Sequence, residues 1–144
     1  MLEVKFYEDV NDELLRFAVI IARHGGKWVF CKHKERETLE CPGGHREPGE
    51  SILETARREL MEETGAVEFE IQPVCIYSVT GKTRVNDVGD ESFGGLFYAE
   101  IASFGEIHSE MEKIVLTDAL PENWTYPEIQ PALLKEAQRR GICV

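Results

Sequence analysis

The stretch GGHREPGESILETARRELMEETGA, residues 43–66, contains the local signals of one capped helix. Ser51 is followed three residues later by Glu54, which is the pattern of a capping box. Gly65 supplies the residue that commonly ends a helix in the left-handed conformation. Apolar residues recur at helical spacing between these signals and define a face that must pack on a core. The sequence therefore predicts a helix that begins at Ile52 and ends at Gly65.

Three glutamates, Glu59, Glu62 and Glu63, lie in the last turns of this helix, where the helix dipole favours cations. Glu59 forms like-charge pairs with both of the others, at spacings of three and four residues. The helical wheel also turns Glu63 toward the apolar face, where an unpartnered carboxylate is costly to bury. A solvated acidic helix face is the simpler interpretation. Because several local rules are broken together, we favour a site in which a divalent cation lies among the carboxylates.

The composition suits one compact domain over residues 1–144, since 42% of the residues are apolar and 30% are charged. The net charge of −11 argues against a general nucleic-acid binder. No apolar run approaches the roughly 18 residues needed to cross a bilayer, so we expect no membrane association. The acidic amino terminus lacks the features of a secretory signal, and the four cysteines form no CxxC pair. We therefore expect a cytoplasmic protein with reduced thiols.

Apolar, β-branched and aromatic runs predict strands on both sides of the central helix. The expected strands are 14–23 and 27–33, joined as a hairpin by glycines, followed by 67–71, 74–80, 93–101 and 113–118. A second helix is predicted within residues 127–141, with Gly141 as its stop. This order of elements predicts an α/β fold with a mixed sheet flanked by helices.

The residues around the first helix also match a known signature. Gly44, Glu50 and the run from Arg58 to Ala66 agree in every position with the signature box of the Nudix hydrolases. The chain thus resembles this family, and the resemblance implies an α/β/α sandwich. It also implies that the box forms a loop-helix-loop that holds Mg²⁺ or Mn²⁺ against a diphosphate.

The resemblance implies roles for individual residues of the box. Hard oxygen ligands of this kind suit Mg²⁺ or Mn²⁺. Arg58 would orient a catalytic carboxylate, and Glu50 would support the site without binding the metal directly. The implied ligands are three carboxylates and one backbone carbonyl: Glu59, Glu62, Glu63 and Gly44.

The general base that activates water stays open between two regions of the chain. Inside the box, the candidates are Glu62 and Glu63. Outside it, Glu112 is preferred over Glu110, and the resemblance to MutT-like relatives makes Glu112 a further candidate metal ligand. A solvated carboxylate at a strand start is the alternative for Glu112. Weaker candidates lie in the polar loop 81–92: Asp87, Asp90 and Glu91.

Residues 25–44 resemble MutT-like nucleoside triphosphate pyrophosphohydrolases, in particular those that remove oxidised purine nucleotides. The expected substrate is therefore a small nucleotide such as 8-oxo-dGTP. The cations expected to hold its phosphates are Lys32, His33, Lys34 and Arg46, with ordinary surface charge as the alternative. Four aromatic residues are candidates for stacking on its base, with a place in the core as the alternative: Trp28, Phe30, Tyr77 and Phe93.

Other functions remain open from the sequence. One is hydrolysis of another diphosphate, such as a nucleotide sugar, a dinucleoside polyphosphate or a 5′ RNA end. Another is a non-catalytic domain that senses a nucleotide, although such a domain would not need Arg58 and all three box glutamates. The resemblance also allows a homodimer.

Overall fold

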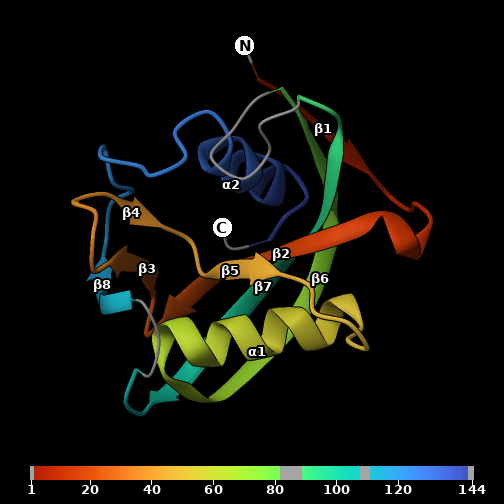
Figure 1. Cartoon of the computed structure of the whole chain (residues 1–144). Coiled ribbons are helices and arrows are strands. Elements are labelled where there is room, and N and C mark those ends of the chain that lie inside the picture. The colour runs from red at the N-terminus through yellow and green to blue at the C-terminus, as the bar shows by residue number, and fades with distance from the viewer. Residues whose placement is uncertain (1, 82–88, 108–110, 143–144) are drawn as a thin grey trace.

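A computed structural model of the protein describes residues 2–81, 89–107 and 111–142 (Figure 1). Its strands are β1 (Glu3–Tyr7), β2 (Leu15–His24), β3 (Lys27–His33), β4 (Leu39–Glu40), β5 (Gly43–His45), β6 (Ala66–Thr80), β7 (Ser92–Phe104) and β8 (Met111–Thr117). Its helices are the 3₁₀ helix η1 (Asp12–Leu14) and the α-helices α1 (Ile52–Thr64) and α2 (Gln130–Arg139). Within these ranges, no helix is both long enough and apolar enough to cross a membrane.

The strands form one mixed sheet in the order β1-β6-β7-β2-β3-β4, with β5 beside β2 and β8 beside β3. β2 and β7 run parallel, whereas the other pairs are antiparallel. A parallel pair needs a long crossover connection, and the chain between β2 and β7 contains both α1 and β6. This crossover allows β2 and β7 to lie parallel in a sheet whose other pairs are antiparallel.

The sheet separates two apolar clusters, and each cluster is covered by one helix. On one side, Ala56 and Leu60 of α1 pack in a cluster that includes Ile20 of β2. On the other side, Leu133 of α2 packs in a cluster that includes Ile21 of β2. Figure 1 shows α1 and α2 on opposite sides of β2. This arrangement confirms the predicted α/β fold, an α/β/α sandwich with a mixed sheet.

Helix α1 begins and ends where the sequence predicted. The Ser51 hydroxyl accepts a hydrogen bond from Glu54 N–H at 3.0 Å, and Glu54 Oε1 accepts one from Ser51 N–H at 2.7 Å. Gly65 has a φ of 76° and its N–H donates to Met61 O. This left-handed conformation is readily available to glycine, so Gly65 stops the helix and starts the chain toward β6.

Other predicted boundaries differ from the structure. Segments 67–71 and 74–80 are one strand, β6, with a register shift between Pro73 and Cys75. Proline has no N–H for the ladder and interrupts the pattern, which made one strand resemble two. The short strands β1, β4 and β5 were not predicted, because segments of five, two and three residues carry little periodicity. The predicted second helix is α2, which spans Gln130–Arg139.

Candidate active site

Strand β5 and the end of α1 lie against each other. Within β5, Gly44 pairs with Ala18 of β2. The Glu63 carboxylate accepts a hydrogen bond from the Gly43 N–H at 2.8 Å. A Cβ atom on Gly44 would overlap the Glu59 carboxylate. Because position 44 has no side chain, Glu59 reaches the backbone of β5, and two carboxylates lie beside the two glycines.

The carboxylates of Glu59 and Glu63 are largely withdrawn from solvent. Burial raises the pKa of Glu63 to about 8, against the opposing effect of the Gly43 hydrogen bond. Burial also raises the pKa of Glu59 to about 7, and the nearby Arg58 guanidinium only partly offsets this. Removing a carboxylate from water disfavours its charged form unless positive charge is close. The described residues therefore offset the negative charge of these two groups only in part.

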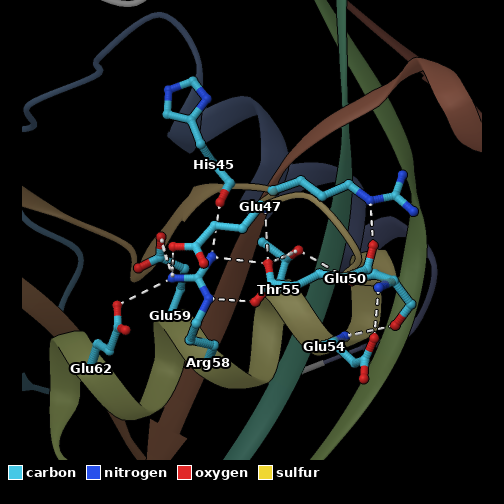
Figure 2. A network of polar contacts seen from close by, with 10 residues as sticks. His45, Glu47, Glu50, Glu54, Thr55, Arg58, Glu59 and Glu62 are labelled. Carbon is cyan, nitrogen blue, oxygen red and sulfur yellow. Dashed lines mark hydrogen bonds and ion pairs between the residues drawn. The ribbon is translucent and has the colours of Figure 1, made fainter.

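Arg58 joins the box loop to the helix, as Figure 2 shows. Its Nε and Nη2 donate to the two carboxylate oxygens of Glu50, at 2.5 and 3.1 Å. Nη2 also donates to His45 O at 3.0 Å, and Nη1 donates to Glu62 Oε2 at 3.2 Å. The same Nη1 lies 3.5 Å from Glu59 Oε2. One guanidinium thus holds the loop, Glu59 and Glu62 in a fixed relation.

Glu50 completes this cluster from the loop side. Besides Arg58, it accepts a hydrogen bond from the Thr55 hydroxyl at 2.9 Å and one from Glu47 N–H at 3.0 Å. The Arg58 hydrogen bond and these further donors lower the pKa of Glu50 to about 2. Both of its carboxylate oxygens accept hydrogen bonds from groups of the loop and the helix, which suits a structural anion of the loop.

A cavity of about 390 Å³ opens on the α2 side of β5. Its walls include Gly44 of β5, Phe17 and Val19 of β2, Tyr77 of β6, and Ile129 just before α2. Pockets of 300–1,000 Å³ with apolar walls are typical of small-molecule sites. The shared Gly44 wall places this cavity next to the carboxylates of α1.

Comparisons with known proteins agree with this geometry. The family model for the NUDIX domain matches residues 13–114, more than half of the chain. The chain belongs to the Nudix family. It is 36% identical over 106 residues to the Bacillus subtilis (strain 168) protein named "Putative 8-oxo-dGTP diphosphatase YtkD". That match covers 72% of this chain but only 63% of YtkD.

Solved Nudix structures share the whole fold. The crystal structure of the Bacillus subtilis pyrophosphohydrolase BsRppH, an E68A mutant, has a TM-score of 0.77 and 27% sequence identity. It matches 97% of this chain and 91% of its own. A NUDIX hydrolase from Nitrosomonas europaea has a TM-score of 0.68 and 21% identity, over 87% of this chain and 89% of its own.

Nudix hydrolases generally use a divalent metal, and the chemistry of the box fits one. Glu59 and Glu63 are desolvated carboxylates, and the Gly44 backbone beside them adds a carbonyl oxygen. Oxygen donors of this kind suit Mg²⁺ or Mn²⁺. Within the described ranges, however, no three His, Cys, Asp or Glu side chains converge as a ready-made metal site. The Glu62 carboxylate is turned to Arg58 and is about half exposed, so its role as a ligand stays a prediction.

Two predicted site residues outside the Nudix box bind each other. Lys32 Nζ donates to Glu112 Oε1 at 3.0 Å, across the antiparallel pair β3 and β8. This hydrogen bond lowers the pKa of Glu112, which makes its carboxylate a weaker base. The predicted roles of Lys32 as a phosphate contact and of Glu112 as a base or ligand each compete with this ion pair. Both roles stay predictions.

The other predicted phosphate contacts differ in their surroundings. The Arg46 guanidinium donates to Asp12 Oδ2 at 2.8 Å and to Glu50 O at 2.8 Å, and it also bonds Asp12 O and Leu15 O. Arg46 thus ties η1 to the box loop with most of its donors. Lys34 is exposed just after β3. For both residues, contact with phosphate stays a prediction.

The weaker acidic candidates are only partly described. Asp87 and Glu110 lie outside the described residues. Asp90 is exposed, and Glu91 accepts hydrogen bonds from the Tyr7 hydroxyl at 2.8 Å and the Ser78 hydroxyl at 2.7 Å. Those bonds join β1 and β6 to the start of β7, which is a structural role.

Of the four aromatic residues predicted to stack on a base, Tyr77 lines the cavity. Trp28 packs under Arg23, Phe30 against Trp124, and Phe93 against Tyr7. The predictions also missed Phe17, which lines the cavity and lies 5.7 Å from Tyr77 between ring centroids. Strand alternation in β2 contained this signal, because Phe17 faces away from the α1 side on which Ala18 packs.

Proposed function

We propose that this chain is a metal-dependent pyrophosphohydrolase that cleaves nucleoside triphosphates to monophosphate and pyrophosphate. Oxidised purine nucleotides such as 8-oxo-dGTP are the first substrates to try, a choice that the name of YtkD also supports. One observation carries the proposal. The desolvated carboxylates of Glu59 and Glu63 adjoin the Gly44 backbone, which is also a wall of a cavity large enough for a base.

The residues of the box have different roles in the proposed hydrolysis. A bound Mg²⁺ or Mn²⁺ supplies positive charge for the phosphoryl oxygens and acidifies water. Glu59, Glu63 and the Gly44 carbonyl would hold the ion, with Glu62 and Glu112 as further ligands. Arg58 keeps Glu59 and Glu62 in place through its bonds to Glu50 and His45.

Hydrolysis exchanges one P–O bond for another. The oxygen of water forms a bond to one of the two phosphorus atoms of the α,β-anhydride while the bond from that phosphorus to the bridging oxygen breaks, so that monophosphate and pyrophosphate are released. The proton of water passes to a carboxylate, for which Glu62, Glu63 and Glu112 are the candidates. The base of the nucleotide would lie in the cavity between Phe17 and Tyr77, with Lys32, Lys34 and Arg46 as candidate phosphate contacts.

A second candidate is hydrolysis of another diphosphate, such as a nucleotide sugar, a dinucleoside polyphosphate or a 5′ RNA end. The likeness to the pyrophosphohydrolase BsRppH, which extends over 97% of this chain, favours keeping it. A third candidate is a domain that binds a nucleotide without hydrolysing it. We further propose a cytoplasmic protein whose partner is a small nucleotide, and a homodimer is the assembly to test.

Pyrophosphate release from a nucleoside triphosphate panel, with Mg²⁺ and with EDTA, tests the proposal. We expect release with Mg²⁺, loss of release in EDTA, and at least a tenfold lower rate in Glu59→Gln. Glu70→Gln changes an exposed glutamate of β6 in the same way and should leave the rate unaltered. Release in EDTA, or a Glu59→Gln rate equal to that of Glu70→Gln, would contradict the metal mechanism.

A further inference from the structure

Strand β1 forms an open edge of the sheet. It pairs with β6 in unbroken register, from Glu3 against Thr80 to Tyr7 against Ile76. It stands first in the sheet order, and in the described part of the chain no strand lies on its outer side. Figure 1 shows β1 at the margin of the fold. The outer N–H and C=O groups of a regular edge strand are a template on which another strand can pair.

This edge lacks the features that usually protect an edge strand, which are proline, a bulge, an uncompensated charge or extreme shortness. β1 contains no proline, its pairing has no register shift, and its one lysine, Lys5, lies 3.8 Å from the Glu3 carboxylate. The other outer strands differ. β4 and β5 have only two and three residues, and the pairing of β8 with β3 is interrupted by a register shift. Addition of a strand is therefore least hindered at β1.

The sequence of this edge is complementary to itself. Residues 2–6 read LEVKF, with an apolar residue at each end and opposite charges on either side of Val4. If two copies pair antiparallel with Val4 opposite Val4, each Glu3 lies opposite the Lys5 of the other copy. Each Leu2 likewise lies opposite a Phe6. Opposite charges and apolar side chains at directly opposed positions both stabilise antiparallel strands.

Both faces of such a pair would match. Glu3 and Lys5 are exposed, whereas Leu2, Val4 and Phe6 pack against the apolar cluster on the α2 side. Side chains alternate between the two faces of a strand, and antiparallel pairing about a two-fold axis places opposed residues on the same face. Four alternating charges would therefore lie together on one face, and the apolar residues would continue the core on the other.

Strand β8 is a longer outer strand but is not complementary to itself. With Ile114 opposite Ile114, Glu112 would lie opposite the apolar Leu116. With Val115 opposite Val115, Glu112 would lie opposite Asp118, which is a pair of like charges. Of these two outer strands, only β1 combines a regular edge with a matching sequence.

We propose that the protein forms a two-fold homodimer in which β1 pairs antiparallel with β1 of a second copy, so that the two sheets become one. The axis passes beside Val4, and Glu3 of each copy meets Lys5 of the other. The net charge of −11 on each chain opposes association, so the local charge pairs and the strand pairing must overcome it. This inference names the interface of the homodimer considered above and does not depend on hydrolysis, because β1 supplies no residue to the box.

Sedimentation velocity at increasing protein concentration measures the dimer. We expect Glu3→Lys and Lys5→Glu each to weaken it at least about tenfold, because each change places like charges at both opposed positions. An equal mixture of the two variants restores opposite charges at both positions, so a mixed dimer should form about as readily as the wild-type dimer. Damage to the fold of either variant, or loss of the ion pair within one chain, cannot produce that recovery.

The matched controls make the same charge changes at exposed positions away from β1. Glu128→Lys and Lys135→Glu, near and on α2, should leave the dimer unchanged. Glu3→Lys also makes the chain less negative, so general repulsion between copies predicts tighter association, the opposite of the effect expected from the interface.

A wild type that stays monomeric, single variants that dimerise like the wild type, or a mixture without recovery would overturn the inference. A strand of another protein on this edge would give the first of these results. Pyrophosphate release is measured on the same samples. Hydrolysis by a monomer contradicts only the interface, whereas a dimer that hydrolyses no triphosphate contradicts only the proposed function.

Discussion

Glu50 and Glu63 are carboxylates of the same box, yet their surroundings are opposite. Glu50 accepts two hydrogen bonds from Arg58, which lower its pKa to about 2. Glu63 is buried with a neutral Gly43 N–H as its hydrogen-bond partner, and burial raises its pKa to about 8. Glu50 already has its counterion in the protein, whereas Glu63 has no ion-pair partner among the described residues. The difference separates a carboxylate that holds the fold from a carboxylate that is suited to a metal or a proton.

Replacing Glu63 with glutamine should produce the largest effect. Glu63→Gln keeps an oxygen for the Gly43 N–H but removes the charge, so we expect the Mg²⁺-dependent rate to fall by about 10²-fold or more. The stability of the metal-free protein at pH 8 should not fall, because a buried charge has been removed. Steady-state kinetics and urea denaturation measure the two quantities. A rate within threefold of the wild type would remove Glu63 from the catalytic site.

Substitution of Arg58 should act mainly on folding stability, in contrast to substitution of Glu63. Arg58→Lys loses the two-pronged contact with Glu50 and the bond to His45 O, so we expect about 1 to 2 kcal/mol less stability. The control is Arg57→Lys, whose guanidinium lies over the Phe69 ring on the exposed side of the helix. Urea denaturation at pH 7 compares them. Equal stability of the two variants would mean that the Arg58 cluster is not structural.

The smallest expected effect is the pH dependence of stability without metal. The folded pKa of Glu63, about 8, lies above its ordinary value of 4.5, so the folded state holds its proton more tightly than the unfolded state. The stability from this group is complete below about pH 4.5 and is lost as the pH rises to 8. Glu50 acts oppositely, since its lowered pKa contributes stability above pH 4.5 that is lost in acid.

Thermal unfolding in EDTA between pH 5 and pH 8.5 measures this dependence. We expect the melting temperature to fall across that range, because the unfolded state releases the Glu63 proton at lower pH than the folded state does. Glu63→Gln should flatten the slope, and Mg²⁺ should raise the wild-type melting temperature most at the alkaline end. If the melting temperature in EDTA instead rises from pH 6 to pH 8.5, and does so equally in the wild type and the variant, the pKa of Glu63 is not raised by burial.

Local features of the sequence predicted the central helix and its surroundings well. The Ser51 and Glu54 capping box, the Gly65 stop and the inward turn of Glu63 all depend on residues within one or two helical turns. The mixed sheet with flanking helices followed from the order of the longer strands and helices, and the α/β/α sandwich followed from the resemblance to the Nudix family. The short strand β5 was missed, because its pairing with β2 depends on contacts that its own three residues do not encode.

What the sequence by itself determined is the Nudix box: its helix, its caps, and the crowding of Glu59, Glu62 and Glu63 that calls for a cation. Only the tertiary structure decided that Lys32 meets Glu112 and that Arg46 is held by Asp12. It alone also built a cavity from Phe17, Tyr77 and Gln130. Helix periodicity and capping arise from bonds between near neighbours, so they can be read along the chain. A cavity wall joins segments more than a hundred residues apart, such as β2 and the start of α2, and depends on how the sheet brings them together.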